Sequence, residues 1–197
     1  KEVLYELQNR WFPTKSGLLS DDKAEERRKR IQAAQSYEEA VIWWKMAAEA
    51  NHRDAKYMLG LCYEQGQGVK QSYEEAVKWW KAAMDDGYVV ANVSLGILYE
   101  QGKGVEKSYE KAVELYRSAA EKNYSKAMFY LGNCYRYGLG VERSYKETVK
   151  WYKMAASVYV LYDREIQSEA KAALKTIYVE DSLNLINKFL FWIGFMK

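Results

Sequence analysis

The order of apolar and polar residues repeats every 36 positions along most of the chain. Residues 35–70, 71–106 and 107–142 align without insertions, and a fourth, partial copy covers 143–157. Each copy contains two stretches in which apolar residues recur three or four positions apart, and this spacing predicts amphipathic helices. One helix pair is too small to bury its own apolar side, so consecutive pairs are expected to stack. The predicted fold class is therefore an all-α solenoid of stacked antiparallel helix pairs.

A serine marks the predicted start of the first helix in every copy, and in three copies a glutamate follows three residues later. This spacing predicts a pair of reciprocal hydrogen bonds at a helix start. The serine oxygen accepts from the backbone N–H of the glutamate, and the glutamate carboxylate accepts from the backbone N–H of the serine. Lys111 replaces the glutamate in the third copy, which weakens that cap alone. The serines are Ser36, Ser72, Ser108 and Ser144, and the glutamates are Glu39, Glu75 and Glu147.

The second helix of each copy has alanine, leucine and tyrosine at four-residue intervals, which predicts one apolar side. Gly60, Gly96 and Gly132 lie inside these helices although glycine costs about 1 kcal/mol there, so we expect a neighbouring helix to approach closely. A Gly-x-Gly-Val sequence then ends each helix. The alanine, leucine and tyrosine positions are 55, 59 and 63, then 91, 95 and 99, then 127, 131 and 135.

The combined pattern A-x-x-x-L-G-x-x-Y-x-x-G-x-G-V, followed by S-Y-x-x-A-x-x-W-W/Y-x-x-A-A, resembles the Sel-one-like repeat family, a relative of the tetratricopeptide repeats. The resemblance covers about residues 35–157 and is specific, because all of these positions recur in phase. It implies a right-handed superhelix whose members act as adaptors in protein complexes and share no catalytic site. Residues 1–34 and 158–197 depart from the pattern.

Composition and charge narrow the classes of partner. The chain has 197 residues, of which 49% are hydrophobic and 29% charged, as in soluble folded domains. A net charge of +3 is too small for the basic surface of a nucleic-acid-binding protein, so we expect no nucleic acid partner. We expect no membrane insertion either, because the apolar segment 182–197 is shorter than the about 20 residues of a spanning helix. The compartment stays open, because a leader before Lys1 could have been removed. The cytoplasm is slightly preferred.

Two cysteines and one histidine are too few for a structural zinc site of the usual kind. Cys62 and Cys134 occupy the same position two copies apart, so their backbones should lie roughly 18–20 Å apart in a stack of helices. A disulfide needs Cα atoms within about 7 Å, so these two cannot pair. His52 falls in a turn without the acidic or thiol neighbours of a catalytic triad. We expect neither a metal nor a cofactor.

One motif carries a remote enzymatic alternative. Ser108 and Lys111 fit the S-x-x-K signature of serine-acylating, penicillin-binding-type enzymes, and some cysteine-rich members of the resembled family have been linked to penicillin binding. The motif coincides with a helix-cap position, and the S-D-N and K-T-G elements that accompany it are missing. We therefore interpret Ser108 as a helix-capping residue and expect no enzymatic activity.

The predicted binding site is a groove along the second helices. On a helical wheel, three positions per copy point away from the side formed by the alanines and leucines. Five of the nine residues there are apolar, and stacking would join them into one patch with a charged edge. The alternative is that they pack against the adjacent repeat. The residues are Tyr57, Leu61, Glu64, Val93, Ile97, Glu100, Phe129, Asn133 and Arg136.

The ends of the chain need separate interpretation. Residues 1–34 are expected to form capping helices, one around Val3, Leu4, Leu7 and Trp11 and another over Asp22 to Ala34. Residues 158–181 predict a degenerate last repeat: its alanine, leucine and tyrosine come seven residues late, so the helix from Tyr145 should be extended. Lys175 stands at the glycine position, so regular stacking should end there.

The last segment, 182–197, predicts an apolar C-terminal helix that needs a cover. It could cap the last repeat, lie in the groove of its own chain or join a second copy, and the cap is the first choice. The leading function is a noncatalytic adaptor that holds a protein or peptide in the groove. The alternative is a homodimer formed through Ile186, Phe189, Leu190, Trp192 and Ile193.

Overall fold

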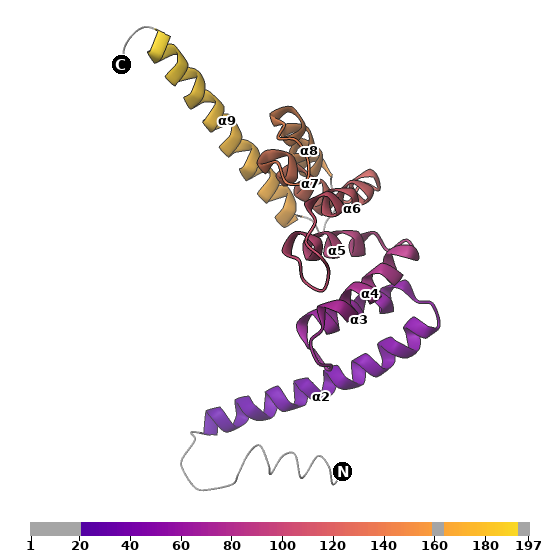
Figure 1. Cartoon of the computed structure of the whole chain (residues 1–197). Coiled ribbons are helices and arrows are strands. Elements are labelled where there is room, and N and C mark those ends of the chain that lie inside the picture. The colour runs from indigo at the N-terminus through magenta and orange to yellow at the C-terminus, as the bar shows by residue number, and fades with distance from the viewer. Residues whose placement is uncertain (1–20, 159–163, 193–197) are drawn as a thin grey trace, which may run out of the picture.

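The structure, a computed structural model, describes residues 21–158 and 164–192. These residues form eight helices and no strand. Figure 1 shows the helices stacked one after another along an arc, with a long helix at each end. The prediction of an all-α solenoid is confirmed. The helix predicted around Leu7 lies outside the described residues. The helices are α2 (Asp21–Glu49), α3 (Arg53–Gln65), α4 (Tyr73–Asp85), α5 (Val89–Gln101), α6 (Tyr109–Glu121), α7 (Ser125–Tyr137), α8 (Tyr145–Ser157) and α9 (Arg164–Trp192).

The serine caps form at three of the four predicted positions. The Oγ atoms of Ser72, Ser108 and Ser144 accept from the backbone N–H three residues later, at 3.2, 3.2 and 3.3 Å. The predicted second hydrogen bond, from the backbone N–H of the serine to the glutamate carboxylate, is wrong. The N–H of each serine donates instead to a tyrosine carbonyl of the preceding helix. Glu75 and Glu147 pair with lysines three residues on.

The fourth prediction, a helix start after Ser36, is wrong. Ser36 lies inside α2, which runs through the boundary expected between residues 34 and 35. The physical reason is the residues that precede it. Before the other serines, Gly-x-Gly adopts positive φ angles and ends a helix, whereas R-I-Q-A-A-Q before Ser36 contains only residues that continue one.

The predicted close approach at the glycines inside the second helices is confirmed, and the structure shows that an aromatic ring of the next repeat makes it. A Cβ atom at Gly60 would overlap the Trp80 ring, and one at Gly96 would overlap the Tyr116 ring. Tyr152 stands against Gly132 in the same way. The three rings are fully buried. Each repeat therefore packs on the next through one aromatic ring that fills the space left by a glycine, which we call the glycine notch.

The C-terminal part differs from the expectation. The predicted extension of the helix from Tyr145 is wrong: α8 ends at Ser157 and has 13 residues, the length of each helix from α3 to α7. The extra residues lie instead between α8 and α9. Ala170 and Ile177 of α9 are buried, whereas Lys175 at the glycine position is exposed.

The helix α9 has 29 residues and passes through the boundary expected at 182 without a break. Residues 164–192 contain neither glycine nor proline, and the Ser182 hydroxyl donates to the carbonyl of Tyr178 at 2.8 Å inside the helix instead of capping a new one. The side chains predicted for self-association, from Ile186 to Ile193, are not among those that the structure describes.

Candidate functional site

Most of the residues predicted to line a groove lie at the junctions between repeats. The Tyr57 ring packs against Tyr88 with the ring centroids 4.9 Å apart, and its hydroxyl is 3.4 Å from Ser94 Oγ. Leu61 and Ile97 are half-buried against clusters of core residues that belong mostly to the repeats that follow them. These contacts are those of the alternative that we stated, packing against the adjacent repeat.

The same column continues into the third repeat. Phe129 stacks on Tyr152 with ring centroids 5.5 Å apart, and Asn133 Oδ1 accepts a hydrogen bond from the Tyr152 hydroxyl. Val93 is only 2% exposed, so the prediction that it lines a groove is wrong. A helical wheel shows which side of a helix avoids its own partner, but the next repeat covers that side.

The charged positions of the column are half-buried as well. Burial raises the pKa of Glu64 and of Glu100, and the charge of Lys103 opposes the shift at Glu64. Glu100 Oε1 lies 3.9 Å from Cys134 Sγ, which belongs to the next second helix. Arg136 pairs with Glu180 of α9 at 3.3 Å. The predicted charged edge is thus engaged with neighbouring elements of the chain.

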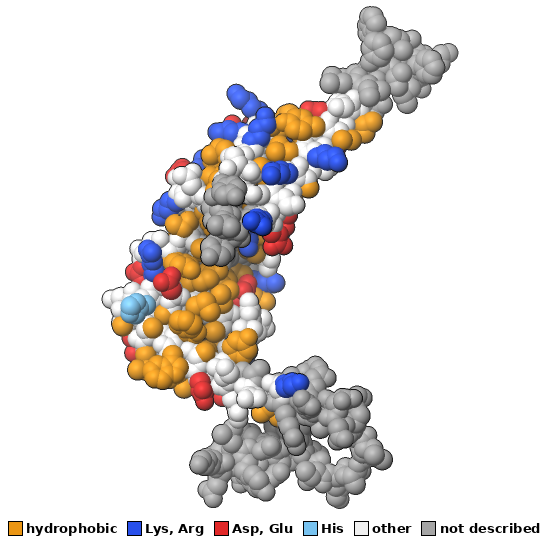
Figure 2. Space-filling view, turned by 180° about the vertical axis from the view of Figure 1, so that it is seen from behind, with side chains coloured by type: hydrophobic (Ala, Val, Ile, Leu, Met, Phe, Trp, Pro, Cys, Tyr) orange, Lys and Arg blue, Asp and Glu red, His pale blue; other side chains and the backbone are white. Residues whose placement is uncertain are grey.

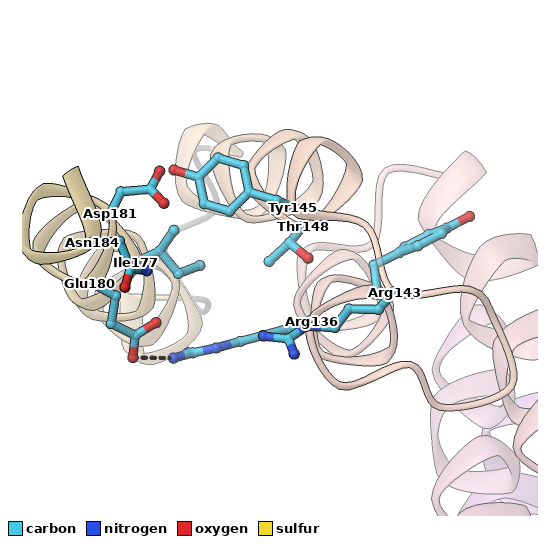
Figure 3. A pocket seen from close by; sticks show the side chains of 9 residues that line it. Arg136, Arg143, Tyr145, Thr148, Ile177, Glu180, Asp181 and Asn184 are labelled. Carbon is cyan, nitrogen blue, oxygen red and sulfur yellow. Dashed lines mark hydrogen bonds and ion pairs between the residues drawn. The ribbon is translucent and has the colours of Figure 1, made fainter. Parts of the chain in front are cut away.

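Figure 3 shows a small cavity where α9 meets α7 and α8. Its volume is about 130 Å³, which is room for a few water molecules. Arg136 reaches across it to Glu180, and a hydrogen bond to Asp181 raises the pKa of the Tyr145 hydroxyl to about 12. These polar contacts connect α9 to α7 and to α8 across the cavity.

A larger cavity, of about 320 Å³, opens between α4, α5 and α6. Two first helices form its sides and one second helix its back. Asn92 is 4% exposed, and its Nδ2 donates to Ser118 Oγ at 3.3 Å. The Lys111 ammonium lies 5.5 Å from the centre of the Tyr99 ring. We call this cavity the Leu115 pocket. Its lining residues are Lys81, Met84, Asn92, Leu95, Tyr99, Lys111, Glu114, Leu115 and Ser118.

None of these lining residues was predicted to bind a ligand, although the sequence contains a signal for the pocket. The position of Leu115 is occupied by tryptophan in the other three copies, at Trp43, Trp79 and Trp151. A smaller residue in a column of large ones indicates a gap in the packing. Figure 2 shows hydrophobic side chains gathered in a band over the middle of one face, with charged side chains along its margins.

The two long helices expose further apolar side chains. On α2, Ile42, Trp43 and Met46 are 59%, 67% and 56% exposed. On α9, Val179 and Leu183 are 51% and 53% exposed. Trp43 holds the position that packs on a preceding helix pair in the next repeat, since its counterpart Trp79 packs on the core of α2 and α3.

The residues considered for chemistry have structural contacts. Ser108 Oγ accepts from Lys111 N–H at 3.2 Å and donates to Glu110 Oε2 at 3.0 Å, as a capping residue does. Cys62 and Cys134 are buried and free, and burial raises the pKa of Cys134 to about 12. The described residues contain no group of three His, Cys, Asp or Glu that could hold a metal. None of their helices is long and apolar enough to pass through a bilayer.

The family model for the Sel1 repeat matches residues 31–52, 53–88, 89–124 and 125–157. Its period agrees with the one found in the sequence, but its second, third and fourth units begin at the second helix of a copy, at residues 53, 89 and 125. No curated protein matches this chain.

Solved structures with this architecture are similar to the chain. A protective antigen of uropathogenic Escherichia coli with an SLR fold is 36% identical with a TM-score of 0.58. A Sel1 repeat protein of Oxalobacter formigenes is 34% identical with a TM-score of 0.59. The matches cover 61% and 64% of this chain, but 26% and 52% of those proteins. The Helicobacter pylori cysteine rich protein B, 22% identical with a TM-score of 0.52 over 68% of this chain and 96% of that one, shares the fold.

Proposed function

The chain belongs to the Sel1 repeat family, and from that premise we propose that it is a noncatalytic adaptor that binds a protein or peptide on the face formed by its first helices. The observation that carries the proposal is the Leu115 pocket. A cavity of about 320 Å³ falls in the size range of ligand sites, and apolar side chains make up much of its lining. The neighbouring faces of α4 and α6 expose lysine and glutamate side chains beside it.

The proposal differs from the groove predicted by sequence in its position. The column of Tyr57, Ile97 and Phe129 packs against the repeats that follow, so the ligand would lie on the other side of the second helices. A repeat scaffold suits this role because stacking sets the spacing of its surface side chains without a contribution from the ligand. The stacked helices would hold the site in shape before the ligand arrives.

The test is selection of a phage-displayed library of random peptides on the immobilised full chain. Selected peptides are then synthesised with a fluorescent label and titrated with the chain in solution. The proposal expects saturable binding that the unlabelled peptide reverses. If no selected peptide binds the folded chain, the adaptor proposal is wrong. Labelling of Ser108 by a β-lactam probe would contradict its noncatalytic part.

A second candidate function is self-assembly through α9, which the exposure of Val179 and Leu183 favours. Light scattering of the full chain over a range of concentrations measures the mass of the particle. A dimer that becomes a monomer in the Val179→Glu, Leu183→Glu double variant would support this candidate. A monomer at every concentration would remove it.

A further inference from the structure

The Leu115 pocket exists because one member of a repeating column is smaller than the others. Trp79 and Trp151 are half-buried against the helix pairs before them and occupy the corresponding positions beside α3 and α7. Leu115 packs on the core of α4 and α5 in the same way but lacks the indole ring. The unfilled volume therefore has a place and an approximate shape, that of a large apolar side chain entering between α4 and α6.

The lining of the pocket combines apolar contact area with a small polar group at the back. Leu95 is 1% exposed and forms part of the floor, with Met84 and Leu115 half-buried beside it. Asn92, held by Ser118, is a buried amide on the same wall. An amide group can bond to a peptide main chain as donor or acceptor. The surface thus offers contacts to an apolar side chain and to the backbone that carries it.

The rim of the pocket has an excess of positive charge. Lys81 and Lys111 are exposed at its edges, together with a single acidic residue, Glu114. No ion pair within the described part of the chain involves either lysine. At the neighbouring junctions the basic groups are occupied: Lys56 pairs with Asp86 at 2.5 Å, and Arg117 donates to the Tyr135 hydroxyl at 3.0 Å. The positive charges of Lys81 and Lys111 are therefore complementary to an acidic ligand.

We infer that the Leu115 pocket receives one large apolar side chain of a peptide ligand, and that a carboxylate next to it in the ligand pairs with Lys81 and Lys111. This inference rests on the proposed adaptor function and names the ligand chemistry of its site. The apolar side chain supplies the buried contact area. The two lysines set the orientation of the peptide and its preference for acidic over basic sequences.

Peptides selected on the full chain are the probes for the test. We expect their shared motif to place an acidic residue beside Leu, Met, Phe or Trp. Leu115→Trp fills the pocket with the residue of the other copies, and we expect it to weaken binding at least tenfold, equivalent to about 1.4 kcal/mol. Lys81→Glu with Lys111→Glu should weaken binding of the acidic peptides and favour peptides in which lysine replaces the acid. Lys45→Glu, at the position of Lys81 in the first repeat, is the matched control and should leave binding unchanged.

The outcomes separate this inference from the adaptor proposal. If the selected peptides bind the wild-type chain and Leu115→Trp equally well, the inference is wrong while the adaptor proposal stands. If no peptide binds at all, both are wrong. Amide chemical shifts of the ¹⁵N-labelled wild-type chain give a reading that needs no variant. Peptide-induced changes centred on α4, α5 and α6 support the pocket, and changes confined to other helices overturn it.

Discussion

The indole of Trp80 lies directly on Gly60 of the preceding helix and donates a hydrogen bond from its Nε1 to the carbonyl oxygen of Tyr57 at 3.1 Å. The ring therefore has a partner for its polar atom and apolar contacts around the rest of it. The carbonyl belongs to the same helix as the glycine. Packing and hydrogen bonding fix the same contact between two repeats, and Tyr116 with Gly96 repeats the packing part of it.

A methyl group in this notch should separate the repeats. We expect Gly96→Ala to lower the free energy of unfolding by about 1–3 kcal/mol, because the Tyr116 ring is fully buried and has little space to move. Urea titration followed by circular dichroism measures the change. Lys175→Ala is the matched control, since Lys175 holds the same repeat position on α9 and its side chain is exposed. An equal loss of stability in the control would contradict the conclusion that the Tyr116 ring leaves no space for a side chain at Gly96.

The capping serines and the serine inside α2 should respond oppositely to the same substitution. Ser108→Ala removes the acceptor for the Lys111 N–H and should cost about 1 kcal/mol. Ser36→Ala should be neutral or stabilising by a few tenths of a kcal/mol, because Ser36 is exposed within a continuous helix where alanine is the better helix former. Thermal unfolding of both variants decides the point. A similar cost at Ser36 would place a helix start there after all.

The contrast between these two serines shows what the sequence could predict. The helix pairs, the caps at Ser72, Ser108 and Ser144, and the close helix approach at each glycine all follow from local signals that repeat in phase. At the ends the signals were incomplete. Ser36 and Ser182 resemble helix starts, but no helix-ending glycine precedes them, so both lie inside longer helices. Whether a helix continues depends on the residues before a cap as well as on the cap.

The candidate site was harder to predict for a different reason. The helical wheel placed Tyr57, Ile97 and Phe129 away from their own helix pair, which is correct, but it carries no information about the pair that follows. The pocket arises because leucine stands at position 115 where the other copies have tryptophan. Both residues are apolar, so the pattern of apolar and polar positions does not reveal the difference. Comparison of the four copies, column by column, would have identified it, since Leu115 is the exception among three tryptophans.

Glu100 should make the stability of the chain depend on pH. Burial raises the pKa of its carboxyl above the ordinary value of 4.5, so the folded chain holds this proton more tightly than the unfolded chain does. The stabilisation is therefore present below the unfolded value and is lost as the pH rises through the folded value. Glu100→Gln should unfold at higher urea concentration than the wild type at neutral pH, with the difference shrinking toward about pH 4. Glu114→Gln, at an exposed site, is the control, and an equal pH dependence in it would contradict this assignment.

The last prediction concerns the way α9 is held on the repeats, where one buried side chain and one exposed side chain lie two positions apart. Ile177 is 4% exposed and lines the junction with α7 and α8, whereas Val179 is 51% exposed. Ile177→Ala should cost about 2–5 kcal/mol, because it leaves a cavity beneath a helix that has no later repeat against its described outer face. Val179→Ala should change the stability by less than about 0.5 kcal/mol. Hydrogen exchange resolves the location: amides of α9 should lose protection first in Ile177→Ala, while those of α4 and α5 keep it, because each repeat contacts mainly its neighbours. Equal loss of protection in all helices would mean that the stack unfolds as one unit and that α9 is not a separately held end.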